Sequence, residues 1–534
     1  YLVVGLPVRP TSYAHPACTI LHHGRVLDTV PALDSQAAKA DFTAWENAGL
    51  ACPYTLYRCG SLRFSVLSCH PDRLALYAPN AVAAGAQLLV VPCCVPVRAG
   101  SIARWKRQAS ALSHALGCGI VLVNGGAGET SSPSFYRSLG VLYECGAELN
   151  GSGSADEPLC VTADYDADII NAHSFPEKEE ATSLGVGALK PNPKTRLFRP
   201  VRKEPFLPTD FAESQDYLEE LFRFQYEALA ARLRATGIQK LVLGVSGGVD
   251  STLAMLVCAK ALDSLRLPRH NLISITMPGF GTTDRTYYNS ISLMDQLGAD
   301  RREISIKQAV LQHFEDIGHD PGVHDVTYEN AQARERTQIL MDVANKEGGL
   351  VVGTGDLSEA ALGWCTFGGD QFAAYNVNAS VTKNVARDIL RQQAESKDFC
   401  VARRALLDVL DTPVSPELLP PSASGEIHQK TEDILGPYEL HEFFLYYFVR
   451  YAMAPSKIVK YAATAFAEQY EPEYIRSVMR TFLKRFFGGQ FKRSSAPDTA
   501  ALTDVSLASP YFTIPSDASA KAMIDELEQG SALY

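Results

Sequence analysis

The sequence predicts an α/β protein built in two parts. Short apolar runs alternate with stretches of helical periodicity along most of the 534 residues, which is the order that sheets covered by helices require. Residues 174–213 lose this periodicity and collect prolines and charges, as interdomain linkers do. A hydrophobic content of 46% in a chain of this length can form a substantial core. We therefore expect one domain at residues 1–173 and a second at residues 214–534.

The first part shows a strand–helix–strand order. Residues 1–6 read as a buried strand, and because a domain rarely opens inside a core strand, we expect further residues before Tyr1. Residues 87–92 and 119–124 are apolar and predict two more strands, and residues 101–116 between them have the period of an amphipathic helix. This order predicts a layered α/β fold.

The second part has the stronger pattern. Residues 216–236 predict an amphipathic helix, and Gly237 closes it. The segments that follow alternate in the order typical of a doubly wound parallel sheet, with strands expected at 240–245, 271–277 and 350–353 and helices at 286–297 and 330–346. Residues 436–487 are rich in aromatic side chains and predict helices packed against that sheet.

Charge and cysteine usage exclude several classes of function. With 49 basic and 60 acidic residues the net charge is −11, which argues against nucleic-acid partners. No apolar run is long enough to span a bilayer, which argues against a membrane protein. The twelve cysteines are scattered and include no Cys-x-x-Cys pair, so we expect buried thiols in a cytoplasmic protein and no thiolate metal site.

The sharpest local signal is the glycine-rich segment at residues 244–251, which lies between an expected strand and an expected helix. Free amide groups at a helix start, together with the hydroxyls of Ser246 and Ser251, predict a cradle for phosphates. Asp250 at the same helix start suits a magnesium ion held against those phosphates. The segment lacks the lysine that a Walker loop requires.

This segment resembles the Ser-Gly-Gly-x-Asp-Ser loop of the ATP pyrophosphatase family. Members of that family cleave ATP between its α and β phosphates and transfer AMP to an acceptor oxygen. A nitrogen or sulfur nucleophile then displaces the AMP. The resemblance implies an ATP site formed by Gly244, Val245, Ser246, Gly247, Gly248, Val249, Asp250 and Ser251.

The flanking segments resemble the synthetase domain of glutamine-dependent NAD synthetases over about residues 210–525. They include Met-Pro-Gly-Phe-Gly-Thr-Thr-Asp-Arg-Thr at 277–286, Gly-Thr-Gly-Asp-Leu-Ser-Glu at 353–359 and Gly-Trp-Cys-Thr-Phe-Gly at 363–368. The resemblance implies that ATP adenylates deamido-NAD, that ammonia displaces AMP to form NAD, and that the protein is a homo-oligomer. It also implies an ATP contact at Thr354, magnesium ligands at Asp250 and Glu359, and a deamido-NAD site at Asn330, Glu359, Trp364, Cys365, Thr366, Phe367 and Lys492.

The first part resembles the nitrilase-like amidase domain that releases ammonia from glutamine in these enzymes, an αββα sandwich. Residues 63–72 match the strand that ends in the nucleophile, which places Cys69 at the nucleophile position. The family's Cys-Glu-Asp is Cys-His-Pro-Asp at 69–72 here, and Ala32 stands where the lysine that steadies the oxyanion is expected. The general base, a glutamate, is expected upstream of Tyr1.

Three interpretations of this part stay open. The glutaminase is intact, with its glutamate before Tyr1 and a displaced lysine such as Lys39; or the domain is degenerate and the synthetase uses free ammonia; or Cys69 is a core thiol. On the residues we favour the degenerate domain. For the whole chain, the alternative functions are another amidotransferase of the ATP pyrophosphatase type and a non-catalytic nucleotide-binding protein.

Overall fold

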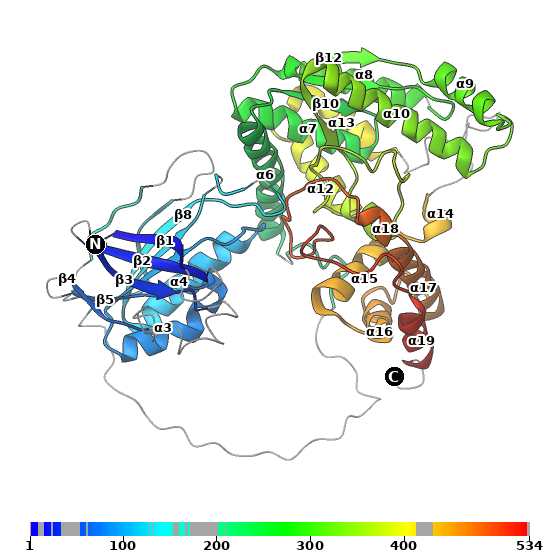
Figure 1. The fold of residues 1–534 in the computed structure, drawn as a ribbon. Helices are drawn as coiled ribbons and strands as arrows, with labels where there is room; N and C mark the ends of the chain where they lie inside the picture. Colours follow the sequence, from blue (N-terminus) through cyan, green and yellow to red (C-terminus); the bar gives the residue numbers. More distant parts are fainter. Residues whose placement is uncertain are drawn as a thin grey trace. The chain divides into compact units, whose positions relative to one another are not determined.

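The structure is a computed structural model (Figure 1). It describes residues 2–8, 15–22, 25–33, 54–59, 62–126, 128–130, 132–152, 160–165, 169–170, 201–208, 210–282, 284–412 and 431–530. The chain divides into two compact units, residues 1–130 with 135–188 and residues 131–134 with 189–534. Most of the expected linker at 174–213 lies outside the described residues, so the domain limits at 173 and 214 stay predictions.

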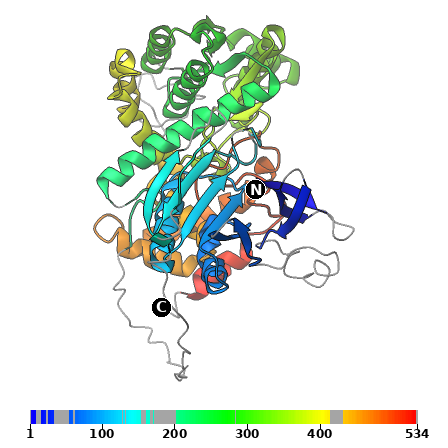
Figure 2. The ribbon, with the colours of Figure 1, turned by 90° about the vertical axis from the view of Figure 1, so that its left-hand side faces the viewer.

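The first unit contains two sheets, whose strands are drawn in blue and cyan in Figure 2. The smaller sheet is antiparallel and has the order β1-β2-β3, with β1 at Leu2–Val8, β2 at His15–His22 and β3 at Arg25–Pro31. The larger sheet has the order β4-β5-β6-β7-β8-β9, and its strands are β4 (Tyr57–Cys59), β5 (Leu62–Val66), β6 (Leu88–Cys93), β7 (Gly119–Asn124), β8 (Leu139–Glu144) and β9 (Ala147–Ser152). Strands β5, β6 and β7 are parallel.

Apolar side chains from both sheets share one core. Cys18, Ile20 and Val30 of the smaller sheet pack with Phe64 and Val66 of the larger one. Helices α3 (Leu74–Ala83) and α4 (Ser101–Leu116) belong to the same unit, and α4 packs against β7, β8 and β9. The expected strands at 87–92 and 119–124 and the helix at 101–116 are confirmed, as is the mixed α/β class.

The second unit contains a five-stranded parallel sheet with the order β12-β11-β10-β13-β14. Its strands are β10 (Lys240–Gly244), β11 (Leu272–Thr276), β12 (Asp300–Glu303), β13 (Gly349–Gly353) and β14 (Tyr375–Asn376). The chain moves outward from β10 to β12 and then returns to the other side of β10 at β13. This reversal leaves a crevice at the carboxyl ends of β10 and β13, where doubly wound sheets bind their ligands.

Helices flank this sheet, as expected for a doubly wound fold. Helices α9 (Lys307–Ile317) and α10 (Val326–Glu347) share a core with β10, β11 and β13. Helix α7 (Val249–Ser264) contacts β10 and packs with α6 (Phe211–Thr236) and α12 (Lys383–Ala394). Helices α8 (Asp284–Leu297) and α13 (Arg403–Leu410) pack together beside them.

Two helices begin earlier than the sequence indicates because aspartates cap them. Asp210 accepts the amide N–H of Glu213, so α6 begins at Phe211 instead of 216. The Asp325 carboxylate accepts two amide N–H groups, so α10 begins at Val326 instead of 330. Strand β12 was not expected, because its four residues are all charged, as suits the edge of a sheet.

Residues 436–487 are helical, as expected, but the expectation that these helices pack against the sheet is wrong. Their aromatic side chains bury one another in a separate core, which includes no strand residue in the described part of the chain. The helices are α15 (Tyr438–Tyr451), α16 (Pro455–Ala465) and α17 (Pro472–Gly488), joined by α19 (Lys521–Gly530). Leu357 and Leu362 of the short helix α11 (Leu357–Leu362) are buried in the same core, so these helices support the loop that follows β13. In the described part of the chain, no helix has the length and apolar character needed to cross a membrane.

Candidate functional site

The glycine-rich loop lies where the sequence predicts it, between β10 and α7. Two serine hydroxyls hold its turn: Ser246 Oγ accepts the amide N–H of Gly248 at 3.2 Å and lies 3.2 Å from Ser251 Oγ. Ser251 Oγ also accepts the amide N–H of Ser246. Helix α7 begins at Val249, directly after the loop. The amide N–H groups of its first turn therefore have no acceptor within the helix and lie at the loop. The structure therefore places all eight residues of the expected ATP site in one strand–loop–helix turn.

Gly247 cannot be replaced in this turn without strain. Its φ is +88°, in the left-handed region that side chains disfavour. A Cβ atom there would lie 2.2 Å from the carbonyl oxygen of Thr286. The close approach of α8 to the loop thus requires a glycine at this position.

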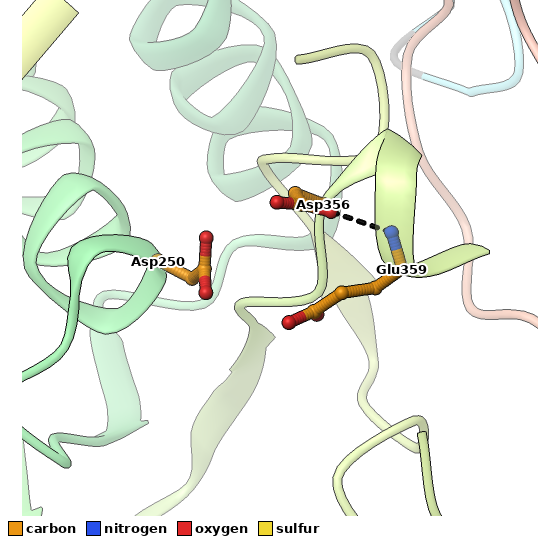
Figure 3. A group of neighbouring side chains, drawn as sticks. All are labelled: Asp250, Asp356 and Glu359. Atoms are coloured by element: carbon orange, nitrogen blue, oxygen red, sulfur yellow. Dashed lines mark hydrogen bonds between the residues drawn. The ribbon is translucent and has the colours of Figure 1, made fainter. Parts of the chain in front are cut away.

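Three carboxylates meet beside the loop (Figure 3). Asp250 lies in the first turn of α7, and Asp356 caps α11 by accepting the amide N–H of Glu359 at 2.7 Å. One oxygen of each carboxylate lies within 4.8 Å of the others. Asp250 and Glu359 are therefore brought together as predicted, and Asp356 is a third member that the sequence did not indicate.

A buried lysine lies at the centre of this cluster. Lys383, at the start of α12, places its Nζ 2.6 Å from Asp250 Oδ2, 3.0 Å from Asp356 Oδ2 and 2.9 Å from Glu359 Oε1. Its side chain is 3% exposed. The sequence carries one signal for this residue: a lysine in the first turn of a helix is opposed by the helix dipole, so another group must hold it there.

The electrostatics of the cluster are dominated by burial. Burial raises the pKa of Glu359 to about 7, because desolvation penalises the carboxylate more than Lys383 stabilises it. The pKa of Asp356 is also raised by burial. Desolvation opposes the charge on Lys383, but the three carboxylates together hold its pKa well above the ordinary value.

The donor set of this cluster fits a magnesium ion. Magnesium prefers oxygen ligands, and carboxylates supply them. Asp250 Oδ1 is a buried oxygen without a hydrogen-bond partner. With three carboxylates and one ammonium the cluster keeps a formal charge of −2 when all are ionised, so Asp250, Asp356 and Glu359 could hold a divalent cation.

A buried asparagine joins the loop to Thr354. Asn378 donates from Nδ2 to the carbonyl oxygens of Asp250 and Thr354, both at 2.9 Å, and its Oδ1 accepts from Gln225 Nε2 of α6 at 3.1 Å. Thr354, the predicted ATP contact, follows β13 and is thereby linked to the first turn of α7. Sequence reasoning missed Asn378, because nothing local marks an asparagine as a link between the loop after β13 and the first turn of α7.

A pocket adjoins the carboxylates. Its walls include Asp356, Glu359, Cys365, Asp370 and Lys492. Lys492 donates from Nζ to the carbonyl oxygens of Gly363 at 2.8 Å and Cys365 at 2.6 Å. Of the residues predicted to contact deamido-NAD, Glu359, Cys365 and Lys492 therefore share one cavity.

The other four predicted contacts do not line this pocket. Trp364 packs against the aromatic core, with the Arg485 guanidinium 4.9 Å from its ring centroid. Thr366 is buried and donates its amide N–H to Asp370, whereas Phe367 is 42% exposed. Asn330 lies on α10. Their roles stay predictions.

In the first unit, Cys69 follows β5 and is buried. The amide N–H of Leu33 donates to the carbonyl oxygen of Ser68 at 2.8 Å, so the end of β3 lies beside Cys69. Ala32 is the residue before Leu33. The position at which the resemblance places a lysine is therefore next to the expected nucleophile, and it carries a methyl group.

Comparison with known proteins identifies the family. The family model described as NAD synthase matches residues 222–486. The glutamine-dependent NAD(+) synthetase of Mycobacterium bovis is 31% identical over 586 residues, which cover 99% of this chain and 86% of that protein. This chain belongs to the glutamine-dependent NAD(+) synthetase family.

Further relatives of this NAD synthetase family member agree with the assignment. The glutamine-dependent NAD(+) synthetase of Mycobacterium leprae is 38% identical over 358 residues, which span 62% of this chain and 52% of that protein. The structure of the glutamine-dependent NAD(+) synthetase from Cytophaga hutchinsonii matches with a TM-score of 0.68 at 15% identity, over 99% of this chain and 86% of that one. That likeness confirms the expected two-part α/β fold.

Proposed function

We propose that this chain amidates deamido-NAD to NAD at the crevice of its second unit, with ATP and magnesium. One observation carries the proposal: the glycine-rich loop, three carboxylates and Lys383 meet at the carboxyl ends of β10 and β13, beside an open pocket. A loop for phosphates, a site for a divalent cation and a cavity for an acceptor are the parts that such a reaction needs.

The loop binds the phosphates of ATP. The ATP phosphates lie at the N-terminus of α7, where amide groups and the Ser246 and Ser251 hydroxyls can donate hydrogen bonds to them. The helix dipole also favours negative charge at this end. Asp250, Asp356 and Glu359 hold magnesium, which neutralises phosphate charge when bound. Asn378 fixes the position of Asp250 relative to Thr354 through its two hydrogen bonds.

The pocket receives the nicotinate end of deamido-NAD. Its carboxylate oxygen attacks the α-phosphorus of ATP and pyrophosphate leaves. Ammonia then attacks the acyl carbon, and AMP leaves with the electron pair of the broken C–O bond. Lys492 helps to shape the cavity because its two hydrogen bonds fix the chain at Gly363 and Cys365.

The nitrogen arrives as ammonia, released from glutamine at Cys69 or taken from solution. Ala32 beside Cys69 favours the second source, because a methyl group cannot stabilise an oxyanion. We further propose a cytoplasmic homo-oligomer.

The test is the substitution Asp250→Ala, with NAD formation measured from deamido-NAD, ATP, magnesium and ammonium. We expect the rate to fall by roughly a hundredfold or more, with the circular dichroism spectrum unchanged. Asp342→Ala, at an exposed position of α10, is the control and should keep the wild-type rate. Near-normal turnover of Asp250→Ala would contradict the metal assignment. Pyrophosphate release with another acceptor but not with deamido-NAD would favour a different amidotransferase.

A further inference from the structure

Lys383 is held by the carboxylates around it and not by its own helix. Its Nζ contacts one oxygen of each of Asp250, Asp356 and Glu359, within 2.6–3.0 Å. It is a cation in the first turn of α12, where the helix dipole opposes positive charge. Without these contacts a buried ammonium would be strongly disfavoured. The cluster and the lysine therefore neutralise each other in part.

The carboxylates that hold Lys383 are also those suited to a metal. The group that could hold a metal consists of the same three residues, and one oxygen of each lies within 4.8 Å of the others. A small divalent cation bound among them would sit about 2.0–2.5 Å from each oxygen. The ammonium already lies among these oxygens, and two cations at such separations repel strongly in a poorly solvated site.

We propose that Lys383 and a divalent cation compete for the three carboxylates. In the metal-free protein the ammonium is the resident counterion, and binding of the metal releases Lys383 from at least two of its contacts. The inference rests on the proposed function only for the identity of the ion as magnesium. The competition itself holds for any small divalent cation and involves neither ATP nor turnover.

The test measures binding of Mn²⁺ without nucleotide, from the electron paramagnetic resonance signal of the free ion. Lys383→Met removes the charge and keeps most of the side-chain volume, and we expect it to bind Mn²⁺ about tenfold more tightly than the wild type. Lys383→Arg keeps the competing charge and should bind no more tightly than the wild type. Lys260→Met is the control, because Lys260 pairs with a single carboxylate, that of Asp398 at 2.6 Å. Its affinity should be unchanged.

Thermal unfolding gives a second readout. Without metal, Lys383→Met leaves one buried and two partly buried carboxylates uncompensated and should melt below the wild type. Saturating Mn²⁺ should raise its melting temperature by more than it raises that of the wild type, because the ion binds the folded variant more tightly. Equal affinities, or equal shifts in melting temperature, would overturn the inference.

If Lys383→Met does not fold, crystals of the wild type alone can test the competition. Anomalous diffraction from crystals with and without Mn²⁺ should locate the ion in the cluster and show Nζ beyond hydrogen-bond distance of at least two carboxylates. An ion bound with all three lysine contacts intact, or no ion at the cluster, would refute the competition. If Mn²⁺ displaces Lys383 but the protein does not form NAD in the turnover assay, the proposed function alone would be refuted.

Discussion

At the scale of single residues, the site depends on two positions that carry no charge. Gly247 allows α8 to approach the loop, and Asn378 ties the loop to Thr354. Both act on backbone atoms, so substitutions there should alter stability and ATP binding together. Each can be tested against a matched position elsewhere in the second unit.

We expect Gly247→Ala to destabilise the protein by more than about 1 kcal/mol, because a positive φ and a close carbonyl oppose the methyl group. The KM for ATP should rise. Gly318→Ala is the control: its φ is also positive, at +68°, but a Cβ atom there meets nothing within 4 Å. It should lower stability only modestly and leave the KM unchanged. Equal effects in urea unfolding and in KM would show that the approach of Thr286 is unimportant.

Asn378→Ala removes both hydrogen bonds to the partly buried carbonyl groups of Asp250 and Thr354. We expect a loss of about 2–3 kcal/mol in the free energy of unfolding and a lower kcat/KM for ATP. Asn345→Ala, at an exposed position of α10, should change neither. Urea unfolding and initial-rate kinetics provide the two measurements, and an unchanged kcat/KM in a destabilised variant would reduce Asn378 to a purely structural role.

At the scale of elements, α15 fixes the two helices that carry Glu359 and Lys383. Its Glu442 accepts hydrogen bonds from Ser358 of α11 at 3.1 Å and from the amide N–H and Nδ2 of Asn384 of α12, both at 3.0 Å. Burial raises the pKa of Glu442 to about 7 from an ordinary value of 4.5. The aromatic helices therefore support the site through a group that titrates near neutrality.

The sign of this shift predicts a pH dependence of stability. A raised pKa in the folded state means that the protonated carboxyl favours folding. The contribution is fully present below pH 4.5 and is lost as the pH rises through about 7. Relative to Glu442→Gln, we expect the wild type to lose ~3 kcal/mol between pH 4.5 and 7. Urea unfolding at several pH values measures the difference, and parallel curves for the two proteins would contradict the shift.

At the scale of the whole molecule, the proposed amidation site and the expected nucleophile lie in different units. The residues proposed for amidation lie in the second unit, and Cys69 with Ala32 lies in the first. The source of nitrogen can therefore be tested without disturbing the synthetase site. The outcome depends on the side chain beside Cys69.

We expect ammonium to support NAD formation far better than glutamine does, and Cys69→Ala to leave the ammonium-dependent rate unchanged. Ala32→Lys restores a cation beside the expected nucleophile and should raise the glutamine-dependent rate only, because the synthetase site lies in the other unit. The measurement is NAD formed with each nitrogen source. Vigorous use of glutamine by the wild type, abolished in Cys69→Ala, would show an intact glutaminase.

The sequence alone determines the larger elements and the place of the glycine-rich loop at 244–251. The helix expected at 101–116 matches α4 residue for residue, and the loop at 244–251 lies between β10 and α7 as expected. Both are local features: a repeat of side chains along one helix face, and a short run of glycines and serines at a strand end. Such patterns do not depend on distant parts of the chain.

Only the tertiary structure decides which side chains meet. Lys383 reaches Asp250 across 133 positions of sequence, and Asn378 reaches it across 128. Trp364, which lies next to Cys365 in the sequence, packs against the aromatic helices, whereas Cys365 lines the pocket. Strand order places the ends of β10 and β13 side by side. That order arises from the packing of helices on the sheet, which no local pattern of residues specifies.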